Sequence, residues 1–93
     1  MPLFVLTCLD KPDALEVRMG AREAHLAWVK DQPLKLGGPF LDAQGQMAGS
    51  MLIIEVADRA AAERFAAEDP YGKAGLFASV DIRPFRVTID NWG

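Results

Sequence analysis

The chain has 93 residues, of which 51% are hydrophobic and 25% charged, and its formal net charge at pH 7 is −3. This length gives room for a single domain over residues 1–93, and the composition excludes a disordered or fibrous chain. The acidic balance predicts no nucleic-acid partner, because such binding needs clustered positive charge. No run of residues approaches the roughly 20 apolar residues that span a bilayer, so we expect no membrane association.

The first half of the chain predicts a strand, a helix and a second strand. Leu3–Leu9 is a short, β-prone apolar run that fits a buried strand. Ala14–Lys30 has helical composition, and the helix ends before Pro33 because the residue preceding a proline avoids the α region. Leu34–Leu41 is predicted as the second strand, in which Gly37-Gly38-Pro39 indicates a bulge or a close backbone approach.

The second half predicts a strand, a helix and a fourth strand. Met47–Val56 follows a hairpin turn and fits a third strand, and Asp58–Glu68 fits a helix capped by its first residue. Asp69–Gly72 is expected to stop that helix. Ser79–Ile89 is predicted as the fourth strand, where Pro84 favours an edge position or a bulge.

The element order βαββαβ predicts a ferredoxin-like α+β fold, with both helices on one face of an antiparallel sheet. The other face of that sheet is then uncovered. The first and third strands carry more apolar residues than one buried face requires. We therefore expect a homodimer in which two sheets pack face to face.

The cysteine and histidine content limits the chemistry. Cys8 is the single cysteine, so no internal disulfide can form, which fits the reducing cytoplasm; we expect its side chain to serve as a small core hydrophobe. One cysteine and one histidine give no metal-ligand spacing. The chain also carries no cofactor fingerprint, so we expect no metal and no cofactor.

A polar cluster interrupts the apolar face of the first helix. Arg18, Arg22 and His25 fall near the middle of its apolar arc, where an unpaired charge is costly. Asp69 follows Phe65 by four residues on the inner face of the second helix, so it can reach His25. A carboxylate beside an imidazole fixes its tautomer and suits a general acid or base.

Three further residues can complete a pocket around this pair. The Gly38 amide and the Ser50 hydroxyl can reach it from the second and third strands, and Tyr71 can contact a substrate from the turn after the second helix. Ser50 has the alternative of being an ordinary strand residue. Tyr71 is as compatible with core packing as with substrate contact.

The polar residues of the first helix also have structural interpretations. His25 can be a hydrogen-bonded core residue. Arg18 and Arg22 can lay their stems over the core and leave their charged heads in water. Asp69 before a proline can be a helix stop and nothing more.

Taken together, the motifs resemble the YciI-like (YCII-related) family. The match covers nearly the whole chain in order. Its pieces are Arg22–Leu26, Gly38-Pro39, Gly49-Ser50, Ile54-Glu55, Asp69–Phe77 and Ile82–Phe85. The resemblance implies a dimeric α+β barrel of ferredoxin-like protomers and a site with a His-Asp pair, here His25 and Asp69. Some relatives act in elimination or dehalogenation steps on small cyclic compounds.

The favoured hypothesis is a cofactor-independent enzyme that performs elimination, dehalogenation or isomerisation on a small oxygenated or aromatic acid. His25 would be the acid or base and Asp69 its orienter, while Arg22, Ser50 and the Gly38 amide would bind an anionic oxygen. The first alternative is a dimer that binds or senses a small anion without chemistry. The second is a structural dimer whose polar residues serve only interface specificity.

Overall fold

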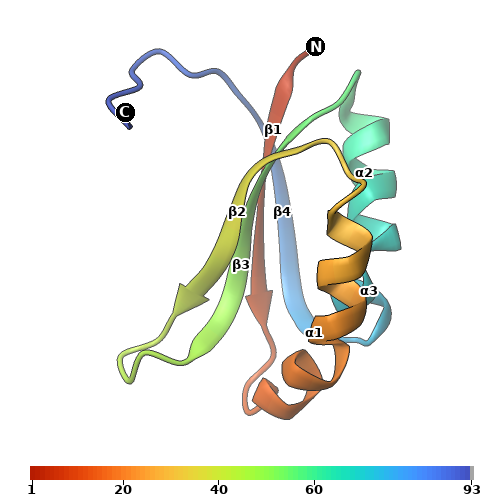
Figure 1. Ribbon diagram of the computed structural model, residues 1–93, viewed down its shortest axis with the longest axis vertical. Helices are drawn as coiled ribbons and strands as arrows, with labels where there is room; N and C mark the ends of the chain where they lie inside the picture. Colours follow the sequence, from red (N-terminus) through yellow and green to blue (C-terminus); the bar gives the residue numbers. More distant parts are fainter. Residues whose placement is uncertain (93) are drawn as a thin grey trace.

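Four antiparallel strands form one sheet, and all the helices lie on the same side of it (Figure 1). This is the arrangement of the computed structural model, which describes residues 1–92. The elements are β1 (Leu3–Asp10), α1 (Leu15–Val29), β2 (Leu34–Leu41), β3 (Met47–Glu55), α2 (Arg59–Glu68), α3 (Pro70–Lys73) and β4 (Phe77–Phe85). The strand order is β2-β3-β1-β4, which confirms the predicted ferredoxin-like α+β fold.

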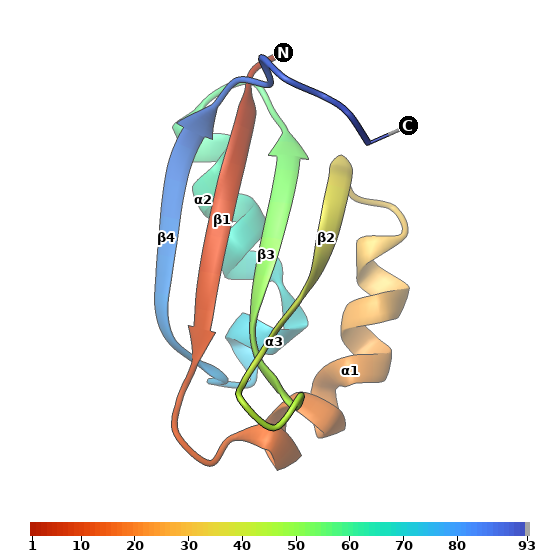
Figure 2. The same cartoon turned by 90° about the vertical axis from the view of Figure 1, so that its left-hand side faces the viewer.

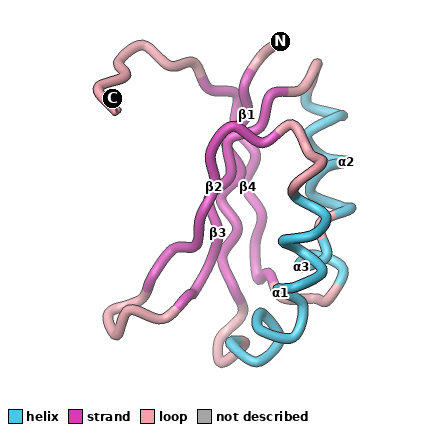
Figure 3. Tube along the Cα trace, viewed as in Figure 1, coloured by secondary structure: helices cyan, strands magenta, loops and turns pink. Residues whose placement is uncertain are grey.

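The second half of the chain departs from the prediction at the end of the fourth strand and in the turn after α2. The fourth strand ends at Phe85 rather than Ile89, because Phe85 pairs with Leu3, the first residue of β1. Residues 86–92 pair with no strand of the described chain and leave the sheet as a loop (Figure 3). The turn after α2 contains a short helix, α3, that the sequence pattern did not predict.

The apolar core lies between the sheet and α2. Phe4, Leu6 and Cys8 alternate along β1 and point to the helices, and all three are buried. They pack with residues of β3 and with Phe65 of α2. Burying each large side chain stabilises the fold by about 1.5–3 kcal/mol. The predicted role of Cys8 as a core residue is confirmed.

The other side of the sheet, which we call the open face, is uncovered in the protomer. It carries four exposed apolar side chains, Leu9, Leu36, Phe40 and Phe85. Figure 2 views the sheet from this side, with α2 behind it and α1 lying beyond the β2 edge. The uncovered apolar sheet face predicted from the sequence is therefore present in the protomer.

Helix α1 buries few apolar side chains. Val17, Met19 and Leu26 are 41–52% exposed. The residues of α1 that are fully buried are Arg18 and His25. At 15 residues, α1 is the longest helix in the described chain, and none there is long and apolar enough to cross a membrane.

Gly49 of β3 pairs with Leu9 of β1 and has no room for a side chain. A Cβ at Gly49 would lie 2.6 Å from the Cys8 carbonyl oxygen and 3.1 Å from Cδ2 of Phe40. We expect Gly49→Ala to lower the free energy of unfolding by about 1–3 kcal/mol in urea denaturation, because backbone would have to move. Gly38→Ala is the control, since a Cβ there meets no atom of the described chain within 4 Å. Equal losses in both variants would contradict this account.

Candidate active site

A cavity of about 220 Å³ lies between α1 and strands β2 and β3. Drug-sized ligands usually occupy about 300–1,000 Å³, so this space suits one small ring. Its polar lining comes from Arg18, Arg22 and His25 of α1, Ser50 of β3 and Tyr71 of α3. The walls are apolar side chains and the Gly37-Gly38-Pro39 stretch of β2. Five of the six predicted site residues therefore line one cavity.

The sixth predicted residue, Asp69, lies behind His25 rather than in the cavity wall. Asp69 adopts an extended backbone (ψ 124°) because Pro70 follows it, which ends α2. Its Oδ1 atom accepts a 2.9 Å hydrogen bond from the Tyr71 backbone N–H and so caps α3. The turn at Asp69 therefore both ends α2 and provides the contact with α1.

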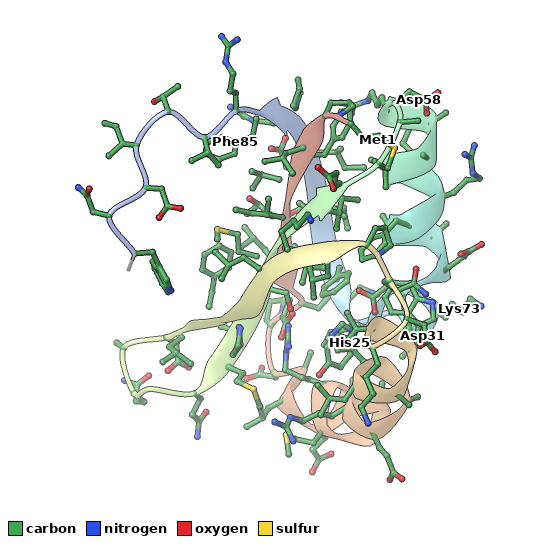
Figure 4. All side chains as sticks on the ribbon, turned by 45° about the horizontal axis from the view of Figure 1, so that its top comes forward. Met1, His25, Asp31, Asp58, Lys73 and Phe85 are labelled. Atoms are coloured by element: carbon green, nitrogen blue, oxygen red, sulfur yellow. The ribbon has the colours of Figure 1, made fainter. Side chains whose placement is uncertain are left out.

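His25 is held by Asp69 in one orientation. The distance between His25 Nδ1 and Asp69 Oδ1 is 2.9 Å, and both side chains are buried. An ionised carboxylate can only accept, so Nδ1 donates and Nε2 of the neutral ring carries the lone pair. Nε2 has no hydrogen-bond partner within residues 1–92. Figure 4 shows His25 on the inner side of α1.

Aromatic rings fix the plane of the imidazole. The Tyr71 ring stacks on His25 with centroids 4.1 Å apart and an interplanar angle of 16°. Trp28 contacts the imidazole at a centroid distance of 6.1 Å. Burial raises the pKa of the Tyr71 phenol, and the charge of Arg18 offsets part of that effect. The phenol is therefore a protonated hydrogen-bond donor at neutral pH.

A second polar cluster surrounds Arg18. Its Nε and Nη2 atoms donate to the two carboxylate oxygens of Asp10 at 2.8 and 2.9 Å, and Nη2 also donates to Ser50 Oγ at 2.9 Å. The guanidinium carbon lies 4.6 Å from the centre of the Tyr71 ring. Burial alone would lower the pKa of Arg18, but the hydrogen bonds and charge of Asp10 outweigh it, so its pKa is raised.

The interpretation that Arg18 leaves its guanidinium in water is therefore wrong, because its side chain is 2% exposed. The compensating charge comes from Asp10, which lies one residue beyond the predicted end of the first strand. The signal was present in the alternation of β1. Asp10 follows Phe4, Leu6 and Cys8 at a period of two, which points its side chain to the helices.

Arg22 behaves differently from its neighbours on α1. It is exposed at the rim of the cavity and makes no ion pair with any residue of the described chain. For Arg22, the prediction that the guanidinium lies in water is therefore correct. Its positive charge is consequently free to attract an anionic ligand to the cavity.

Cys8 lies close to the site but is chemically inert. Burial raises the pKa of the Cys8 thiol to about 12, and the negative charge of Asp69 adds to the effect. The thiolate form, which is the nucleophile, is scarcely populated at neutral pH. Cys8 therefore belongs to the core and not to the candidate active site.

These observations define a small α+β protein with an imidazole and a carboxylate paired beside a cavity. A family model of the YCII-related domain matches residues 2–86, so the chain belongs to this family. Protein YciI of Escherichia coli is 35% identical over 94 residues, which cover 90% of this chain and 96% of that protein.

Two solved structures are also similar. One is 5-chloro-2-hydroxyhydroquinone dehydrochlorinase (TftG) of Burkholderia phenoliruptrix AC1100, in complex with 2,5-dihydroxybenzoquinone. It shares 34% identity and a TM-score of 0.86, over 90% of this chain and 93% of that one. An antibiotic biosynthesis monooxygenase, at 14% identity and a TM-score of 0.59 over 96% of this chain and 100% of that one, shares the fold alone.

Ionisation of Cys8 should weaken the fold at alkaline pH. The pKa of the thiol is 9.0 ordinarily and about 12 in the fold, so the folded chain holds the proton more tightly. This contribution to stability is complete below about pH 9 and falls as the pH rises toward 12, by up to about 1.4 kcal/mol per pH unit. Urea titrations from about pH 8 to about pH 11 measure the slope. Cys8→Ala should flatten it, and equal slopes would refute the assignment.

Proposed function

We propose that the chain is a cofactor-independent enzyme that eliminates a leaving group, such as chloride, from a small hydroxylated ring. The observation that carries the proposal is the His25–Asp69 pair, which leaves Nε2 without a protein partner in residues 1–92 while His25 lines a cavity large enough for one ring. The similarity to a dehydrochlorinase at 34% identity supports the reaction class. His25 acts as the acid and base, and Asp69 orients it and stabilises the imidazolium.

The chemistry needs a group that both accepts and returns a proton. One proton moves from a ring hydroxyl to the carbon that bears the leaving group. Removal of a second hydroxyl proton then expels that group with its bonding pair, so the products are a quinone, H⁺ and the halide. Nε2 of His25 can serve both transfers, since Nδ1 stays bonded to Asp69 throughout.

The other lining residues are proposed to bind the substrate. Arg22 attracts the phenolate form at the rim of the cavity, and Tyr71 borders the cavity while its ring holds the plane of His25. Ser50 and the Gly38 backbone contact ring oxygens. A lone buried Cys8 agrees with the cytoplasmic location that we propose for this reaction.

Substitution of either residue of the pair should lower turnover without unfolding the chain. We expect His25→Ala to lower kcat/KM at least roughly 100-fold, because general acid–base catalysis contributes about 10²–10⁴-fold. Asp69→Asn should lower it about 10–100-fold, since a hydrogen bond to a charged group contributes about 1.5–3 kcal/mol. Chloride release from 5-chloro-2-hydroxyhydroquinone is the measurement.

Asp58→Asn is the matched control for Asp69→Asn. Asp58 caps α2 through a 2.9 Å hydrogen bond from the Ala61 backbone N–H, and it lies far from His25 (Figure 4). Its substitution removes a capping carboxylate without touching the cavity, so turnover should be unchanged. Full activity in His25→Ala would refute the proposal. Saturable binding of the compound with no chloride released by the wild-type chain would favour the binding module.

We also propose that a second copy of the chain covers the open face. Its exposed apolar residues Leu9, Leu36, Phe40 and Phe85 lie on all strands but β3, so a flat partner of the same kind can bury them together. The helices and the cavity lie on the opposite side of the sheet and stay accessible in this dimer.

A charge on the open face should separate the copies. We expect Leu9→Lys to shift the chain from dimer to monomer in sedimentation velocity, because an unpaired ammonium would be buried between the sheets. Met19→Lys is the control, since Met19 is about as exposed as Leu9 (52% against 48%) but lies on α1. A monomeric wild-type chain, or a dimer that survives Leu9→Lys, would contradict the proposed interface.

A further inference from the structure

We infer that Asp10, Arg18 and Ser50 form a second subsite of the cavity, in which Arg18 positions the Ser50 hydroxyl to donate a hydrogen bond to a ligand oxygen. The inference deepens the proposed function and rests on it for the class of ligand, a small ring with carbonyl or phenolic oxygens. Arg18 is a positioning residue here, because it acts through Ser50.

The direction of the Ser50 hydroxyl follows from donor and acceptor chemistry. A guanidinium has only donors, so Ser50 Oγ must accept the 2.9 Å bond from Arg18 Nη2. The hydroxyl proton of Ser50 is then free for another acceptor. Within the described chain it has none, although the side chain is buried and borders the cavity. The acceptor that fits is an oxygen of a molecule in the cavity.

Asp10 determines what kind of oxygen this subsite suits. Its carboxylate occupies Nε and Nη2 of Arg18 and balances the positive charge. The local charge is therefore near zero, unlike that at the rim beside Arg22. A neutral hydroxyl beside a compensated ion pair suits a carbonyl or a delocalised phenolic oxygen better than a compact, fully charged anion.

The subsite and the His25–Asp69 pair meet at one aromatic ring. Tyr71 stacks on His25 at 4.1 Å between centroids, and the Arg18 guanidinium carbon lies 4.6 Å from the same ring centre. A ring in this cavity can therefore be held by Ser50 at one oxygen while another of its hydroxyls faces His25. Binding at Ser50 would orient the ring without taking part in proton transfer.

A double-mutant cycle on binding tests whether Arg18 acts through Ser50. The probe is 2,5-dihydroxybenzoquinone, which carries no halide to eliminate, and calorimetry measures its Kd. We expect Ser50→Ala and Arg18→Lys each to weaken binding about tenfold, the effect of one hydrogen bond. Lysine keeps the positive charge, but its ammonium cannot reproduce the planar guanidinium geometry that donates to Asp10 and Ser50 together. The double variant should also lose about tenfold, since both changes remove the same bond.

Controls separate positioning from a purely structural role. Ser79→Ala and Arg83→Lys make the same substitutions at exposed positions on β4, and they should leave Kd unchanged. Ser50→Thr keeps the hydroxyl and should retain most of the affinity. If Arg18→Lys fails to fold, Asp10→Asn is used in its place. This substitution weakens the hydrogen bonds that hold the Arg18 guanidinium but keeps the arginine itself.

The outcomes distinguish this inference from the proposed function. Unchanged affinity in Ser50→Ala, or absence of probe binding by the wild-type chain, would overturn the subsite. If the double variant loses about tenfold in affinity, as expected, but the chain releases no chloride, the subsite is supported and the proposed elimination reaction is wrong. If chloride is released and the cycle is additive, only the positioning role falls.

Discussion

The hydrogen bonds of the Asp69 carboxylate connect the parts of the molecule that form the cavity. One oxygen accepts from the Tyr71 backbone, which starts α3, and from His25 Nδ1, which holds α1. Among the other elements, α1 packs mainly against α3, so the position of α1 depends on this turn. A buried carboxylate is stable only when donors surround it, and here two elements supply them. The hydrogen bonds that shape the cavity are therefore the same ones that hold α1 and α3 in place.

The molecule separates its stabilising core from its polar site. The apolar core is made by β1, β3 and α2, with Leu6 and Ile54 almost fully buried. Helix α1 buries mainly polar groups instead, Arg18 against Asp10 and His25 against Asp69. A domain of this size buries a modest share of its surface, and buried ion pairs contribute little to stability against an apolar alternative. Polar side chains placed there at such a cost are characteristic of a binding or catalytic role.

The sequence predicted those features of the fold and the site that depend on residues close together in the chain. The hydrophobic runs located every long element, and β2 has the predicted bounds. The spacing of Phe65 and Asp69 predicted that the carboxylate would approach His25, and the two are in contact. The end of β4 could not be predicted locally, because it is determined by where β1 begins. The partner of Arg18 needed a strand and a helix to be placed together, so the pair with Asp10 emerged only in three dimensions.

Gly49 and Ser50 are consecutive residues that face opposite sides of the sheet. The missing side chain of Gly49 lets Phe40 and Leu9 approach each other across β3 on the open face, while Ser50 bonds to Arg18 on the other side. A shift of β3 that made room for a side chain at Gly49 would therefore also move the Ser50 hydroxyl, which accepts a hydrogen bond from Arg18 on the other side. The open face and the cavity share one short stretch of β3, so a substitution on one side changes the backbone that carries the other.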